Sequence, residues 1–276
     1  MPTIAERAQT FADLHKAGCF VMPNAWDVGS AQMLAGLGAK AIATASAGLA
    51  GTLGLPDGGV GRDVALAHAR ALVDAVAIPV SADLENCYAD SPEGVAETVR
   101  LAAETGLAGC SVEDKRHGAA EFYDATLAAE RVAAALEAAA GVGRPFAITA
   151  RADGFLGGGY DLVEALSRAE TFAELGAPCV FVPGIPEDGT LARLCAACGT
   201  AVSHLTGIDP KATPVSGLAE MGVRRISTGP MLFRVAMGAA HAAAHALLAE
   251  DEAHALAERP GWPEANAAMK AGKAGA

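Results

Sequence analysis

The sequence contains few positive charges for its length, and this scarcity excludes two classes of partner. Its 276 residues include 20 Lys and Arg against 32 Asp and Glu, which gives a formal net charge of -12. A surface of that sign repels the phosphates of nucleic acids and of anionic lipids. We therefore expect neither nucleic acid nor membrane as a partner, and we attribute the charge to solubility.

Long apolar runs are also missing, although 52% of the residues are hydrophobic. No run approaches the roughly 20 apolar residues that a membrane-spanning helix needs. Residues 1–18 carry charges throughout and contain no apolar core of the kind found in a signal peptide. We therefore expect the protein in the cytoplasm.

The cysteines lack the grouping of a metal or disulfide framework. The 6 cysteines are scattered, and in the cytoplasm they should be reduced thiols. Cys195 and Cys198 have the spacing of half a zinc or redox motif, but no second pair accompanies them. Because they fall at the end of an expected helix, we interpret them as small core residues.

The sequence is rich in short apolar runs that alternate with stretches of helical spacing. Runs of Val, Ile and Ala of this kind are typical of parallel strands buried on both faces. The eight runs are Cys19–Met22, Lys40–Ala45, Ile78–Ala82, Leu107–Val112, Phe146–Ala150, Cys179–Val182, Thr200–His204 and Arg224–Ser227. Eight strand–helix units predict an α/β protein with a closed (β/α)8 TIM barrel, formed as a single domain by residues 1–276. An open doubly wound sheet ranks second, because no G-x-G-x-x-G stands at a strand-to-helix turn.

Additional segments flank and interrupt the predicted barrel. Residues 3–16 predict an N-terminal capping helix, and residues 46–59 predict a glycine-rich loop. Residues 231–258 predict a long alanine-rich helix, which forms a C-terminal helical extension and carries His241, His245 and His254. Without an acidic partner, these histidines do not indicate a metal site. The tail after residue 260 is expected to pack on a neighbouring molecule or to fray.

Polar residues follow the predicted strands at their carboxyl ends, which form the catalytic face of a TIM barrel. The residues at these ends are Ser46, Ala47, Gly48, Asp57, Asp83, Glu85, Glu113, Asp114, Arg151 and Asp153. Asp83 and Glu85 are two residues apart, so on a strand they would face the same side. We therefore expect several carboxylates and one arginine to converge on one rim.

Such a cluster of carboxylates indicates a divalent metal ion. Several carboxylates a few Å apart cannot all ionise without a compensating cation, and their hard oxygen donors suit Mg²⁺ or Mn²⁺. Arg151 could bind a substrate carboxylate, and Ser46 with the following amides could cradle an anionic oxygen. The pattern predicts a small 2-oxo acid as substrate and a metal ion that stabilises an enolate as a bond breaks beside the carbonyl.

Five motifs, in this order, resemble the isocitrate lyase/phosphoenolpyruvate mutase superfamily, which includes methylisocitrate lyase, oxaloacetate decarboxylase and phosphonopyruvate hydrolase. They are PNAWD (23–27), TASAGLAGTLGLPDG (44–58), PVSADLENCY (79–88), GCSVEDK (109–115) and TARAD (149–153). The resemblance spans approximately residues 18–230. It implies a barrel whose eighth helix is swapped with another subunit, giving a homodimer or homotetramer. It also implies Mg²⁺ and an enolate intermediate.

The resemblance assigns roles to individual residues. It places Asp83 as the direct metal ligand, and Asp57, Glu85 and Glu113 as acids that hold metal-bound water. It places Ser46, Ala47 and Gly48 at the oxo-acid cradle, Arg151 at the substrate carboxylate, and Trp26 either at the pocket wall or in the barrel packing. Glu113 and Arg151 are also expected to take part in catalysis.

Two segments depart from the superfamily pattern. The lyases carry a proton-donating cysteine where this chain reads Lys115-Arg116-His117-Gly118. His117 is therefore a candidate catalytic acid or base, with a solvated loop histidine as the alternative. Cys87 and Ala89 replace usual glycines, which should stiffen a loop expected to move as a lid.

The sequence therefore predicts a Mg²⁺-dependent lyase that acts on a small 2-oxo mono- or dicarboxylic acid by C–C cleavage or decarboxylation. Three alternatives stay open. The first is a protein that binds metal and 2-oxo acid without turnover, and the second is phosphonopyruvate-type P–C bond chemistry. The third is phosphoryl chemistry in which residues 227–229, Ser-Thr-Gly, hold the phosphate.

Overall fold

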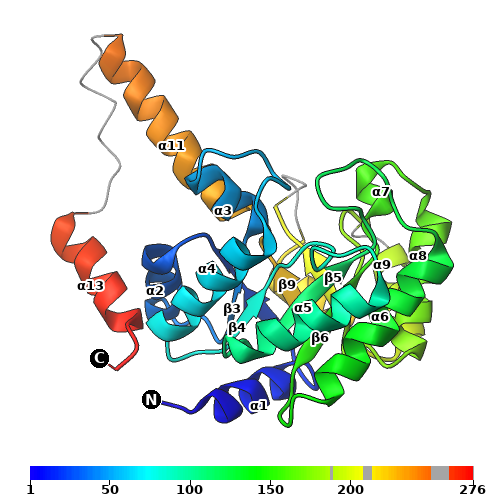
Figure 1. The fold of residues 1–276 in the computed structure, drawn as a ribbon. Helices are drawn as coiled ribbons and strands as arrows, with labels where there is room; N and C mark the ends of the chain where they lie inside the picture. The colour runs from blue at the N-terminus through cyan, green and yellow to red at the C-terminus, as the bar shows by residue number, and fades with distance from the viewer. Residues whose placement is uncertain (187–188, 208–212, 250–260, 276) are drawn as a thin grey trace.

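The computed structural model describes residues 1–275 except 187–188, 208–212 and 250–260 (Figure 1). The strands are β1 Phe20–Met22, β2 Asn24–Ala25, β3 Ile42–Thr44, β4 Val80–Ala82, β5 Gly109–Glu113, β6 Ala147–Arg151, β7 Cys179–Phe181, β8 Ala201–Leu205 and β9 Arg225–Ser227. The longer helices are α1 Ile4–Leu14, α2 Val28–Gly36, α4 Arg62–Ala75, α5 Pro92–Glu104, α6 Ala125–Ala140, α8 Leu162–Glu174, α9 Gly189–Cys198, α11 Met231–Leu248 and α13 Trp262–Gly272. Three short helices are α3 Ser46–Thr52, α7 Gly154–Gly157 and α10 Val215–Glu220.

The strands form a nearly closed parallel barrel with the helices around it. Their order is β1-β9-β8-β7-β6-β5-β4-β3-β2, and every pair in it is parallel. β1 pairs with β9 while β2 pairs with β3, and only Pro23 separates β1 from β2. Because proline has no N–H to donate, it divides what would be the first barrel strand. The predicted (β/α)8 barrel is therefore confirmed, with its first strand in two pieces.

Local sequence signals explain where the helices begin and end. In α5, the Ser91 hydroxyl accepts a hydrogen bond from the Gly94 amide at 3.2 Å, and Pro92 occupies the first turn. Gly106 follows the helix with a φ of 88°, a left-handed conformation that favours glycine. The apolar face of α5 is buried against the sheet, where all five residues of β5 are also buried. Such continuous burial is what a parallel strand covered by helices requires.

The alanine-rich helix predicted after the last strand is present as α11. The structure describes the helix after β9 only as far as Leu248, and His254 lies outside the described residues. α11 projects away from the barrel (Figure 1), and none of its residues is buried. By length and composition alone it could cross a membrane, contrary to the sequence expectation, because alanine counts as apolar and Arg234 is its only charged residue apart from histidine.

Two further predictions for irregular segments were wrong. Residues 46–52 form the short helix α3 rather than a loop. The tail neither frays nor leaves the molecule, because residues 262–272 form α13, which packs on α2 of the same chain. The contact depends on glycine: a β-carbon at Gly36 would lie 2.2 Å from the carbonyl oxygen of Ala268, and one at Gly272 would lie 1.7 Å from that of Gln32.

Candidate active site

A cavity of about 640 Å³ opens at the carboxyl ends of the strands and extends into the barrel. Most of the residues predicted for the site line it. They are Ser46, Ala47, Asp57, Asp83, Glu85, Glu113, His117 and Arg151. The barrel thus brings together side chains from separate strand–helix units, as the TIM-barrel interpretation requires.

Arg151, the last residue of β6, lies among three carboxylates. Its Nη1 is 2.9 Å from Asp83 Oδ1 and 2.7 Å from Glu113 Oε1. Its Nη2 and Nε donate to the two oxygens of Asp153 at 2.7 and 3.1 Å. A substrate carboxylate would therefore have to compete with these acids for the guanidinium, which is already engaged by three partners.

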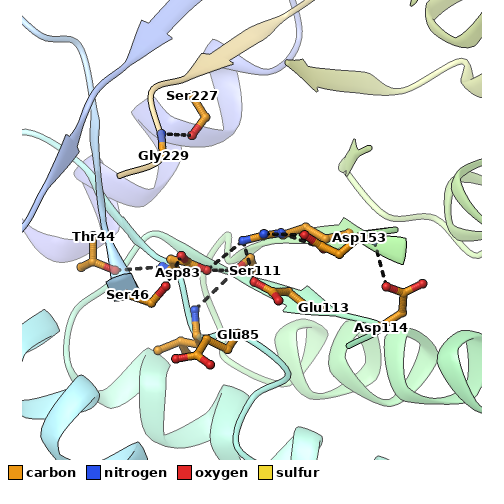
Figure 2. Close-up of polar contacts among 12 residues, drawn as sticks. Thr44, Ser46, Asp83, Glu85, Ser111, Glu113, Asp114, Asp153, Ser227 and Gly229 are labelled. Atoms are coloured by element: carbon orange, nitrogen blue, oxygen red, sulfur yellow. Dashed lines mark hydrogen bonds and ion pairs between the residues drawn. The ribbon is translucent and has the colours of Figure 1, made fainter. Parts of the chain in front are cut away.

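Asp83 lies directly after β4 and has an organised set of donors around it (Figure 2). Its Oδ2 accepts a hydrogen bond from Ser46 at 2.7 Å, and its Oδ1 accepts one from Ser111 at 3.1 Å. The Thr44 hydroxyl accepts a bond from the Asp83 amide at 2.9 Å. These contacts fix the carboxylate at the centre of the rim.

Glu85 reaches the cavity by a different route from the one predicted. β4 ends at Ala82, so strand alternation does not place Asp83 and Glu85 on one side. Instead the backbone of Glu85 is left-handed, with a φ of 51°. The Glu85 carbonyl oxygen accepts a hydrogen bond from the Glu113 amide at 2.8 Å. The expected convergence is present, but a loop rather than a strand produces it.

The loop after β4 holds three non-glycine residues in the left-handed region, namely Glu85, Cys87 and Tyr88. Such residues persist only where the surroundings over-determine them. Asn86 supplies part of this support: its Oδ1 accepts from the Tyr88 amide at 2.9 Å, and its carbonyl accepts from Arg131 at 2.5 Å. The loop that contains Cys87 is thus held by Arg131 of α6, which agrees with the stiffness expected there.

The carboxylates of the rim have strongly altered acidities. Burial raises the pKa of Glu113 well above its ordinary value; Arg151 opposes this shift, while Asp153 and Asp83 add to it. Burial and the nearby Asp83 also raise the pKa of Glu85, against the lowering effect of His117. Burial disfavours the charged form of Arg151, but the adjacent Asp153, Glu113 and Asp83 raise its pKa overall. Perturbed groups in one cleft are typical of a functional site.

His117 lies over the mouth of the cavity. Its Nδ1 is 2.8 Å from Glu85 Oε2, and its ring meets Tyr88 edge to face at 5.0 Å. The next residue, Gly118, approaches the opposite loop so closely that a β-carbon at Gly58 would lie 3.2 Å from its Cα. The two loops therefore meet across the mouth, and the histidine replaces the expected cysteine at a position that faces the acids.

Two predicted site residues lie outside the cavity lining. Trp26 packs edge to face on Phe233 of α11, with ring centroids 5.9 Å apart. Gly48 is buried behind it, and a β-carbon there would lie 2.9 Å from the Trp26 Cβ. Trp26 thus has the packing role considered for it. Gly48 does not line the pocket, and its lack of a side chain allows α3 to lie close to Trp26.

Two residues without a role assigned from the sequence contact the site directly. Asp153 holds Arg151 through both oxygens, and Ser111 donates to Asp83. The sequence placed Asp153 at the rim, two residues after Arg151, but did not reveal that it binds the guanidinium. Ser111 lies within β5 and is 7% exposed, so its small hydroxyl gives no sequence signal apart from inward alternation with Glu113.

The donor set fits a hydrated divalent ion better than a closed metal cage. Across the residues that the structure describes, no three His, Cys, Asp or Glu side chains converge closely enough to hold a metal directly. Mg²⁺ commonly keeps several waters and uses one or two carboxylates. Asp83, flanked by Glu85 and Glu113, offers hard oxygen donors of that kind.

The fold and the site together define an enzyme of the α/β-barrel class, with a carboxylate-rich active site at the carboxyl ends of its strands. The chain belongs to the phosphoenolpyruvate phosphomutase family, whose model matches residues 11–248. This match places it in the isocitrate lyase/phosphoenolpyruvate mutase superfamily, as the motifs predicted.

Three relatives illustrate the similarity. The crystal structure of a putative lyase/mutase from Burkholderia cenocepacia is 38% identical, with a TM-score of 0.91 over 95% of this chain and 95% of that one. An uncharacterized protein of Mycobacterium tuberculosis is 34% identical over 94% of this chain and 96% of its own. A probable 2-methylisocitrate lyase of Corynebacterium glutamicum is 27% identical over 79% of this chain and 72% of its own. The predicted class, a lyase-type enzyme of this superfamily with its exact reaction open, is confirmed at that level.

Proposed function

We propose that the protein is a Mg²⁺-dependent lyase that breaks a C–C bond beside the carbonyl of a small 2-oxo acid and forms an enolate. The observation that carries this proposal is the partly buried cluster in which Asp83 and Glu113 share the Arg151 guanidinium at 2.9 and 2.7 Å. A divalent ion bound beside Asp83 would supply Lewis acidity that favours negative charge on the substrate oxygen. We place the enzyme in the cytoplasm.

The chain's own residues would orient the substrate and move a proton. Ser46 Oγ, at the start of α3, lies within 2.7 Å of Asp83 and is positioned to meet an oxygen of the 2-oxo acid. Arg151 balances the charge of the acids and binds the substrate carboxylate in competition with them. His117, held by Glu85, can deliver or remove a proton at the mouth, where the superfamily's cysteine would stand.

The test is a comparison of wild type with Asp83→Ala by isothermal titration of Mg²⁺ and then of a panel of 2-oxo acids, with a product assay in parallel. We expect Asp83→Ala to lose Mg²⁺ affinity and, with it, binding of the 2-oxo acid. Chelation of the metal in wild type should have the same effect on 2-oxo acid binding. Unchanged affinities in Asp83→Ala would overturn the site assignment.

The same titrations distinguish the remaining alternatives. Binding without product from any acid of the panel would favour a binding protein over a lyase. Turnover of phosphonopyruvate in preference to C–C substrates would favour P–C bond chemistry. Tighter binding of phosphorylated sugars than of 2-oxo acids would favour the hypothesis that residues 227–229 hold a phosphate.

We further propose that α11 packs against a second copy of the chain, giving a homodimer or homotetramer by helix swapping. The support is the helix itself: Val235 is 68% exposed and Met237 is 53% exposed, and no residue of α11 is buried. Light scattering after size exclusion should report a dimer or tetramer for wild type. A Val235→Glu/Met237→Glu variant should shift toward the monomer, whereas a monomeric wild type would overturn the proposal.

A further inference from the structure

Several side chains in the interior of this barrel are small. TIM-barrel interiors are usually filled by bulky branched residues. Here the cavity passes between Ala43, Ser81, Ser111, Thr149 and Ser227, each of which is at least 90% buried. The space that runs from the rim into the barrel therefore continues below Asp83 and Arg151.

Arg225, the first residue of β9, lines the lower part of this cavity and is 3% exposed. Its Nη1 donates to Thr149 Oγ1 at 2.9 Å, and its Nε donates to Ser203 Oγ at 3.0 Å. Thr149 stands two residues before Arg151 on β6, on the same inward face. Arg225 therefore lies one side-chain layer deeper in the barrel than Arg151.

No carboxylate compensates this buried guanidinium. Within the described part of the chain, Arg225 makes no ion pair, and Nη2 has no hydrogen-bond acceptor. Its third contact is His15 Nε2, at 3.4 Å from Nη1. Burial and the nearby arginine lower the pKa of His15 to about 4, so the imidazole is neutral at pH 7. Arginine keeps its proton in proteins, so the charge remains.

The thiol beside Arg225 does not serve as its counter-ion either. Burial raises the pKa of Cys179, although Arg225 itself opposes this shift. A neutral thiol leaves the positive charge of the guanidinium unpaired. Buried charges in proteins are ordinarily paired, so a charged group facing an open cavity indicates a ligand of opposite sign.

We propose that Arg225, with Thr149 and Ser203 orienting it, forms an anion subsite at the floor of the cavity that binds the distal carboxylate of a 2-oxo dicarboxylic acid. This inference rests on the proposed function, in which the 2-oxo end of the substrate lies at the rim. The carboxylates of the rim repel a second carboxylate, and the only cation in the lining below them is Arg225, among the residues that the structure describes. A dicarboxylic acid therefore fits the two ends of the cavity, and a monocarboxylic 2-oxo acid leaves Arg225 uncompensated.

The test compares pyruvate, which has one carboxylate, with oxaloacetate and 2-oxoglutarate, which have two, by isothermal titration in the presence of Mg²⁺. Wild type should bind a dicarboxylic acid at least about tenfold more tightly than pyruvate, the size expected for a charged buried hydrogen bond. Arg225→Met should abolish this preference and leave the pyruvate affinity unchanged within about twofold, because the contacts that bind pyruvate at the rim remain in this variant. The matched control is Arg224→Met, which removes the neighbouring arginine outside the cavity, where it contacts Gly18.

Several outcomes would overturn the inference. An unchanged preference in Arg225→Met would give the arginine a purely structural role, while binding of 2-oxo acids by wild type would still support the proposed function. If wild type binds no 2-oxo acid of either kind, the proposed function fails, and this inference fails with it. If formate raises the affinity of wild type for pyruvate but not that of Arg225→Met, the subsite holds a separate small anion rather than a substrate tail.

A second variant decides the question if Arg225→Met does not fold. Arg225→Lys keeps the charge but loses the planar fork of donors, so the preference for dicarboxylic acids should fall at least about threefold at unchanged pyruvate affinity. A preference identical to that of wild type would count against the subsite. Melting curves recorded with and without 2-oxoglutarate give an independent readout, since only a variant that keeps the subsite should be stabilised by this ligand more than by pyruvate.

Discussion

The mouth and the floor of the barrel cavity each contain an arginine, and the surroundings of the two differ in charge. At the mouth, Arg151 contacts Asp83, Glu113 and Asp153. At the floor, Arg225 contacts two hydroxyl groups and a neutral histidine. The mouth thus has more negative than positive charge, while the floor has a positive charge without a counter-ion among the described residues. The electrostatic potential therefore becomes more positive from the mouth to the floor. This gradient would orient a charged molecule in the cavity before any chemistry occurs.

The largest effect should follow from removing the arginine at the mouth. Arg151→Met leaves three carboxylates without their shared cation, so we expect a loss of about 3–5 kcal/mol in the free energy of unfolding at neutral pH. The loss should shrink as the pH falls, because the orphaned carboxylates become protonated. Urea denaturation of both proteins over a pH series measures it.

The matched substitution at the floor is the control for this prediction. Arg225→Met removes an unpaired charge and should be neutral or stabilising, within about 1 kcal/mol. Equal destabilisation by the two substitutions would show that the charge difference between mouth and floor has no energetic consequence.

The next effect concerns pH and the neutral histidine at the floor. The pKa of His15 is about 4 in the folded protein, below the ordinary value of 6.5, because of burial and the nearby Arg225. Between these two values the unfolded chain binds more protons, so stability falls as the pH drops from 6.5 toward 4, by up to about 3 kcal/mol. In His15→Gln this contribution should be missing from unfolding free energies measured along the same pH range.

The comparison variant for this pH effect is His241→Asn, which changes a histidine on the exposed helix α11. Because His15 and Arg225 are unchanged in this variant, the contribution of His15 should still be present. A wild-type slope in His15→Gln would mean that other groups cause the acid destabilisation.

A smaller effect should follow from removing one hydroxyl from the floor. Thr149→Val keeps the shape of the side chain but deletes the acceptor that Arg225 Nη1 uses at 2.9 Å. We expect a loss of about 1–3 kcal/mol in unfolding free energy, the cost of a buried donor without a partner. In the Arg225→Met background the same substitution should cost almost nothing, and chemical denaturation of the four proteins of this cycle measures the coupling.

The smallest effect is expected for an arginine that lies in solvent near the mouth. Arg116 is 2.6 Å from Asp90, but their side chains are 35% and 66% exposed. A double-mutant cycle of Arg116→Gln and Asp90→Asn should give a coupling below about 0.5 kcal/mol, because water screens the pair. A coupling as large as the destabilisation expected for Arg151→Met would show that water does not screen this pair.

The sequence predicted the barrel because its signals are local. Each buried strand is a short continuous apolar run, and each helix carries its own start and stop residues, as Ser91 and Gly106 do for α5. The acids of the rim were also predictable, because the end of a parallel strand fixes where the next few residues lie. The left-handed backbone of Glu85 was not, since glutamate carries no signal for a positive φ.

The features that the sequence did not reveal depend on contacts between distant segments. Trp26 meets Phe233, which is more than 200 residues away in the chain, and so it packs on α11 instead of lining the pocket. Arg225 adjoins a second arginine in the sequence, and only the closed barrel distinguishes the one that points inward. The place of α13 on α2 likewise depends on glycines at opposite ends of the chain.

The glycine contact between α2 and α13 also limits how this family member could diverge. At Gly36 the obstacle to a side chain is the carbonyl oxygen of Ala268, and at Gly272 it is the carbonyl oxygen of Gln32. Both obstacles are main-chain atoms, which every amino acid possesses. A second-site suppressor can shorten a side chain but cannot remove a carbonyl, so a lineage that loses either glycine could recover only by parting the two helices.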